Sequence, residues 1–194
     1  MSVTIQLPTH VPMMVLPGVL LLPHQLMPLH IFEDKYKKML EDVIHGDRIF
    51  GICDEAIYSP MHRNRIASVG LLHISEQQDD ETSNLMLLGL QKVFIKHVSE
   101  ERVYPFVEVE PVEFPVMNER ENTVIKEHLI ERIDSLLPES DQAAEVLNNM
   151  QQMTDLDLMI DYSCQLMNAH PTIQRKIYQT LKLEEKLALF DDLF

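Results

Sequence analysis

Apolar and polar positions follow one pattern in the first part of the chain and another in the second. Up to about residue 115, short apolar runs are separated by prolines, glycines and polar residues, which is typical of strands and turns. The predicted extended segments are 11–16, 19–22, 29–32, 48–53, 69–75, 85–98 and 102–113. The polar stretch from Glu76 to Asn84 separates two of them and predicts a hairpin turn. Pro105 and Pro111 predict that the last strand is an edge strand or begins at a bulge.

One helix interrupts the strands, at residues 33–45. Its apolar residues recur with a helical period and form one stripe, which consists of Tyr36, Met39, Leu40, Val43 and Ile44. Gly46 follows directly and predicts a C-terminal cap in the left-handed conformation.

From about residue 118 the apolar period becomes helical throughout. A first helix is predicted at 123–137, and Ser140 caps a second. Thr154 and Asp157 resemble a capping box that opens a third helix, and Pro171 suits the first turn of a fourth. Strands followed by helices indicate an α+β fold. We therefore predict a β-rich domain at 1–117 and a helical bundle at 118–194.

Charge and composition restrict the possible partners. The chain carries a net charge of −15, and 45% of its residues are hydrophobic. Residues 1–115 have nine basic against sixteen acidic side chains and residues 116–194 have seven against fifteen, so the two parts have net charges of −7 and −8. Nucleic acid and anionic membranes are therefore unfavourable partners. The absence of a signal-like start and of a long apolar run favours a cytoplasmic protein.

The sequence contains no recognisable catalytic or metal-binding motif. Its five glycines form no phosphate-binding loop, and no G-x-S-x-G or H-E-x-x-H is present. The nine histidines are scattered, and Cys53 and Cys164 are predicted to be buried thiols. We predict no enzyme activity, no metal and no cofactor. The twelve methionines could form an adaptable apolar surface or fill the core.

Five segments, in order, resemble the N-terminal domains of Lon proteases. The first is VPMMVLPGVLLLPHQLMPLHIFEDKYKKMLEDVI, with its centre at Leu22-Pro23-His24 through Pro28-Leu29. The others are VGLLHI, LMLLGLQKVFI, LDLMIDYSCQLM and IQRKIYQTLKLEEKL. The resemblance covers nearly the whole chain and excludes the ATPase and protease parts of Lon, so we expect a stand-alone copy of the recognition domain. It implies a PUA-like pseudo-β-barrel with one helix, followed by a helical bundle.

The resemblance also implies a function, which is the binding of unfolded or flexible protein segments. We expect this binding to use exposed side chains of the 20–27 loop together with two neighbouring methionines: Met13, Met14, Leu20, Leu22, His24 and Met27. Alternatively, these residues belong to the core. Two further functions remain open: an adaptor that docks on a separate protease or chaperone, and, with less support, RNA binding by a PUA-like domain.

Overall fold

A computed structural model describes residues 6–54, 65–114 and 119–193 of the chain. It divides into two compact units, Met1–Val112 and Glu113–Phe194. The predicted boundary between residues 117 and 118 lies outside the described residues. Strands dominate the first unit and helices make up the second, which confirms the predicted α+β class.

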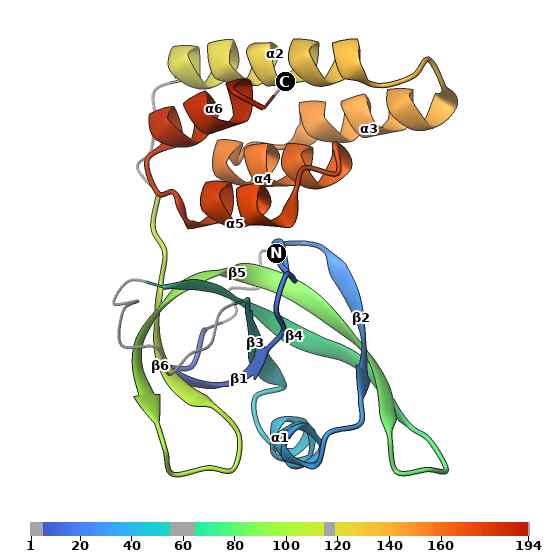
Figure 1. The fold of residues 1–194 in the computed structure, drawn as a ribbon, viewed down its shortest axis with the longest axis vertical. Coiled ribbons are helices and arrows are strands. Elements are labelled where there is room, and N and C mark those ends of the chain that lie inside the picture. The colour runs from blue at the N-terminus through green and yellow to red at the C-terminus, as the bar shows by residue number, and fades with distance from the viewer. Residues whose placement is uncertain (1–5, 55–64, 115–118, 194) are drawn as a thin grey trace. The chain divides into compact units, whose positions relative to one another are not determined.

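The described residues of the first unit form six strands and one helix (Figure 1). In chain order these are β1 (His10–Val15), β2 (Leu26–Ile31), α1 (Asp34–His45), β3 (Ile49–Cys53), β4 (Ile66–Gln77), β5 (Ser83–Ser99) and β6 (Phe106–Pro111). The predicted 19–22 segment is not a strand; it belongs to the loop between β1 and β2.

The strands form one mixed sheet whose pairings close a ring. The order is β2-β5-β4-β3-β1-β6, and an additional pairing joins β6 to β5. β1 and β3 are parallel and the other pairs are antiparallel. β6 therefore has a neighbour on each side, so the predicted edge position is wrong. Its two prolines are tolerated because Pro105 precedes the strand and Pro111 is its last residue.

Two apolar clusters fill the first unit. One lies beneath α1, where Tyr36, Met39, Leu40 and Val43 pack with strand residues such as Phe50. Ile44, which was predicted to share this stripe, is instead 41% exposed. The other cluster draws residues from all five ring strands, and these are Val11, Met13, Ile49, Cys53, Ala67, Val69, Val93, Ile95, Val107 and Val109.

The C-terminal end of α1 differs from the sequence prediction. Gly46 is the cap, but its φ of −107° is not left-handed. The left-handed residue is Arg48, with a φ of 59°, and its N–H donates to the Val43 carbonyl oxygen at 3.2 Å. The chain therefore reverses two residues later than glycine alone suggests.

In the second unit, the part of the chain that the structure describes forms five helices (Figure 1). They are α2 (Glu119–Leu136), α3 (Asp141–Gln152), α4 (Leu156–Leu166), α5 (Pro171–Gln179) and α6 (Leu183–Asp191). Ser140 caps α3 as predicted, by accepting a hydrogen bond from the Ala143 N–H at 3.1 Å. Pro171 occupies the first turn of α5 as predicted.

The start of α4 corrects the predicted capping box. Asp155, not Thr154, is the cap, and it accepts from the Leu158 N–H at 3.1 Å. Asp157 points instead into the bundle, where the ammonium group of Lys186 on α6 donates to its side chain and, at 2.9 Å, to its carbonyl oxygen. Asp161, one turn further along α4, lies 2.8 Å from the same ammonium group. Lys186 thus joins α6 to α4 through charges that are removed from water.

Both cysteines are buried thiols that form no disulfide, as predicted. Burial raises the pKa of the Cys164 thiol to about 12, and the nearby carboxylate of Asp161 adds to the effect. None of the described helices is long and apolar enough to cross a bilayer.

Candidate functional site

The six side chains predicted to bind peptides do not share one surface. Met13 and Met14 are buried in opposite clusters, because successive residues of β1 point to opposite faces of the strand and both faces are covered. Leu22 is also buried. The predicted exposure of these three residues is therefore wrong, and they belong to the core.

The other three predicted residues differ from one another. Leu20 is half-buried and His24 is exposed. Met27 is half-buried and packs against the cluster beneath α1, because it lies opposite Leu87 in the β2–β5 ladder. A binding role for Leu20, His24 and Met27 stays a prediction.

The loop that carries Leu20 and His24 crosses β5 at Gly89. The His24 N–H donates to the Gly89 carbonyl oxygen at 2.8 Å, and the Gly89 N–H donates to the Gln25 carbonyl oxygen at 2.9 Å. On the other side, the Ser68 hydroxyl donates to the Leu21 carbonyl oxygen. The loop is thereby fixed to β4 and β5, and His24 adopts a left-handed φ of 64° at the turn into β2.

An exposed surface that the sequence analysis missed lies beside this loop, on the outward face of β2, β5 and β4. Residues that are directly opposite in a ladder have their side chains on the same face. The ladders place nine such side chains in three rows across the strands, which we call the three-row face: Leu26–Leu88–Leu71, Pro28–Met86–Ile74 and His30–Asn84–Glu76. Two rows are apolar and the third is polar.

The apolar rows are substantially exposed to solvent. Ile74 is 56% exposed and Leu26 is 49% exposed, whereas Leu88 and Leu71 are half-buried. Leu71 also packs against the cluster inside the strand ring, so one end of its row is in contact with the core. Exposed apolar side chains that form one patch, and are not scattered singly, indicate an interaction site.

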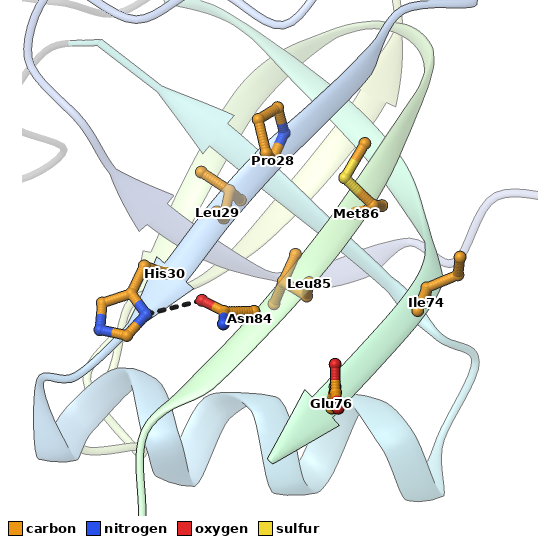
Figure 2. Close-up of a pocket in the computed structure, with 8 residues that line it drawn as sticks. All are labelled: Pro28, Leu29, His30, Ile74, Glu76, Asn84, Leu85 and Met86. Carbon is orange, nitrogen blue, oxygen red and sulfur yellow. Dashed lines mark hydrogen bonds between the residues drawn. The ribbon is translucent and has the colours of Figure 1, made fainter. Parts of the chain in front are cut away.

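A depression of about 380 Å³ lies on this face. Figure 2 shows its lining on the three strands, with α1 beyond them: Pro28, Leu29, His30, Ile74, Glu76, Asn84, Leu85 and Met86. His30 Nδ1 and Asn84 Oδ1 are 2.8 Å apart, which fixes the polar end of the depression. Phe32, 62% exposed, stacks on the His30 ring with 6.0 Å between ring centroids and extends the apolar surface beyond β2.

Among the described strands β2 pairs with β5 alone, and its other edge, which we call the free edge, adjoins the three-row face. In an antiparallel ladder, the backbone N–H and C=O groups of every second residue point toward the partner strand. The Gly89 N–H donates to the Gln25 carbonyl oxygen, so the backbone groups of Met27, Leu29 and Ile31 also point toward β5. The backbone groups of Leu26, Pro28 and His30 then point away from the sheet. Pro28 has no N–H to offer there, so the edge is poorly suited to the addition of another strand.

The described residues present an apolar face with few polar groups on it. Among them, no group of three His, Cys, Asp or Glu side chains could hold a metal ion. The face instead combines apolar area, a rigid strand scaffold and a short polar border, which is the composition expected of a surface that binds by desolvation.

Comparison with solved structures places this fold among Lon N-terminal domains. The N-terminal domain of Mycobacterium avium complex Lon protease matches with a TM-score of 0.75 and 13% identity, over 95% of this chain and 97% of that one. A Lon N-terminal domain protein from Xanthomonas campestris matches with a TM-score of 0.62 and 16% identity, over 95% of this chain and 98% of that one.

Sequence comparison gives the same family. The Lon protease of Dictyoglomus thermophilum is 25% identical over 195 residues, a match that covers 95% of this chain and 24% of that protein. The chain thus spans about a quarter of the length of this relative. Residues 10–193 match the family described as the ATP-dependent protease La (LON) substrate-binding domain. The chain belongs to the family of LON substrate-binding domains.

Proposed function

We propose that this chain is a non-catalytic recognition module that binds unfolded or flexible polypeptide segments on the three-row face. The observation that carries the proposal is the pair of apolar rows exposed across β2, β5 and β4. Membership of a substrate-binding family makes a protein segment the natural ligand.

The energetics of this face suit an unfolded ligand. Burial of exposed apolar surface yields about 25 cal/mol per Å². An unfolded segment offers free apolar side chains, whereas a folded protein has already buried most of its own. The scaffold costs little to order, because the opposite sides of β4 and β5 already pack beneath α1 through Leu72, Leu85 and Leu87.

The test measures binding of a fluorescently labelled, permanently unfolded polypeptide by anisotropy. The variant is Ile74→Asp, which puts a charge in the central row at a side chain that is largely exposed and so spares the core. The matched control is Val103→Asp, because Val103 is 72% exposed and lies outside the three-row face. We expect a loss of affinity of about tenfold or more for Ile74→Asp, in the range of an interface hot spot.

The proposal fails if both variants are folded and bind the polypeptide as tightly as the wild-type chain does. Circular dichroism and thermal melting establish that each variant is folded. Recovery of one folded partner, together with no affinity for the unfolded polypeptide, would favour the adaptor function instead.

RNA binding receives no support from the face. Its lining contains the carboxylate of Glu76 and neither lysine nor arginine, so it does not offer the basic surface that a phosphate backbone requires. A separate protease or chaperone as partner and a cytoplasmic location stay predictions.

A further inference from the structure

The polar row of the three-row face lies next to a strongly acidic turn. Glu76 ends this row on β4, and the turn between β4 and β5 adds three more carboxylates, Asp79, Asp80 and Glu81. These three side chains are exposed, and Glu76 is exposed as well.

The acidic turn is ordered and its charge is held near the polar row. The Thr82 hydroxyl donates to the Asp80 carboxylate at 2.6 Å, and the Thr82 N–H donates to the same oxygen at 3.1 Å. These bonds lower the pKa of Asp80 from its usual value, and the nearby ring of His30 contributes to the effect. Asp80 is thus an ionised neighbour of the polar row at neutral pH.

The spacing of the rows matches a long cationic side chain. Ile74 and Glu76 are two residues apart on β4, which corresponds to roughly 7 Å along a strand. The aliphatic stems of lysine and arginine have a similar length, and they lie readily on apolar surface while the charged end remains in water. A stem placed on Ile74 and Met86 therefore brings a cation to Glu76.

We propose that the occupant of the three-row face is an unfolded segment in which a lysine or arginine flanks apolar residues. The apolar side chains cover the Pro28–Met86–Ile74 row and the cation pairs with Glu76. This inference rests on the proposed function and defines the class of segment that it selects. A second copy of this chain is a poor occupant, because each copy carries a net charge of −15 and would bring like charge to the acidic turn.

The test uses three labelled peptides with the same apolar centre, flanked by lysine, serine or glutamate. Binding to the full chain is measured by anisotropy at low and at high ionic strength. At low ionic strength we expect the lysine-flanked peptide to bind about tenfold more tightly than the glutamate-flanked one, a difference that added salt reduces.

Two variants separate a local effect from the general acidity of the chain. Glu76→Gln and Glu108→Gln each remove one negative charge, but Glu108 is an exposed residue of β6 outside the three-row face. We expect Glu76→Gln to reduce the preference for lysine several-fold and Glu108→Gln to leave it largely unchanged. Equal effects of the two substitutions would overturn the assignment of Glu76.

The outcomes for the two proposals are distinct. If all three peptides bind with equal affinity, the charge preference is wrong and the proposed function stands. If none of them binds, the proposed function itself fails. A dimer in sedimentation that Glu76→Gln strengthens would identify a second copy as the occupant and overturn the inference.

Discussion

The carbonyl group of Leu22 occupies the space that a side chain on Gly89 would require. A β-carbon at residue 89 would stand 2.9 Å from the Leu22 carbonyl carbon, and closer still to its oxygen. The crossing loop and β5 are in contact because residue 89 has no side chain, and this contact places the loop beside the three-row face.

Gly89→Ala is therefore expected to displace the loop. Backbone cannot yield as a flexible side chain does, so we expect a loss of about 3 kcal/mol, the upper end of the usual cost of overpacking, in the free energy of unfolding measured with urea. Gly18→Ala is the control, because a β-carbon there meets nothing within 4 Å. Its only expected cost is the strain of an alanine at a left-handed φ of 77°, which is about 1 kcal/mol. A Gly89→Ala protein as stable as the Gly18→Ala protein would contradict this account.

Pro28→Ala is expected to promote association through the free edge of β2. The substitution restores an N–H that points away from β5, and alanine presents no more apolar area than proline. We expect more high-molecular-weight species than in the wild-type chain, seen by light scattering at high protein concentration. Pro17→Ala, at an exposed position outside the strands, should not produce them. Equal scattering from the two variants would show that Pro28 does not protect the edge.

Lys186→Met is expected to destabilise the helical unit severely. The substitution removes the ammonium group that the buried Asp157 and Asp161 share, and breaking a buried ion pair in this way costs about 3–5 kcal/mol. Replacing both aspartates by leucine in the same protein should recover much of this loss. Lys182→Met is the control, because the ion pair of Lys182 with Glu185 is exposed to solvent and contributes little to stability. No recovery in the triple variant would argue that Lys186 acts by packing and not by charge.

Acid is expected to weaken the anchoring of α1 through Asp42. The Tyr104 hydroxyl donates to Asp42 at 2.6 Å, and this bond, followed by the ammonium group of Lys38, lowers the pKa of Asp42 below its usual 3.8. The unfolded chain then binds a proton more readily than the folded one. The contribution of Asp42 to stability is therefore complete above about pH 4 and is lost as the pH falls through the lower, folded-state pKa.

Thermal melting of the wild-type and Asp42→Asn proteins between pH 7 and pH 3 checks this expectation. The difference in melting temperature between the two proteins should shrink as the pH falls. Asp47→Asn, at an exposed position just after α1, is the control. A difference that stays constant down to pH 3 would show that the charge of Asp42 does not matter.

The sequence predicts those parts of this fold that depend on local patterns. The stripe of Tyr36, Met39, Leu40 and Val43 identifies α1, because one side of that helix is covered and a helical period follows. Ser140 and Pro171 identify helix starts, because their effect is confined to the first turn. The predicted capping role of Asp157 is wrong, because its partner Lys186 lies 29 residues away in the sequence and no local pattern identifies that contact.

The site was harder to predict for a related reason. Met13 and Met14 lie near a proline-bounded turn and appear accessible from their neighbours in sequence, yet both faces of β1 are covered by distant strands. The three-row face is formed by residues from three separate segments, and each row exists only through strand register. The continuous apolar run Leu85–Leu90 indicates that both faces of this strand are apolar, but only the pairing shows which residues belong to the three-row face.

Within the described residues of the first unit, no helix or strand covers the three-row face, and this has a thermodynamic consequence. Most sheets in water-soluble folds are covered by a second layer on the side that carries apolar residues. A bound segment would supply that layer, so the ligand would complete the architecture of the unit and raise its melting temperature in proportion to occupancy. A preference for unfolded over folded proteins then needs no particular sequence, because only an unfolded chain exposes the apolar side chains that would form this layer.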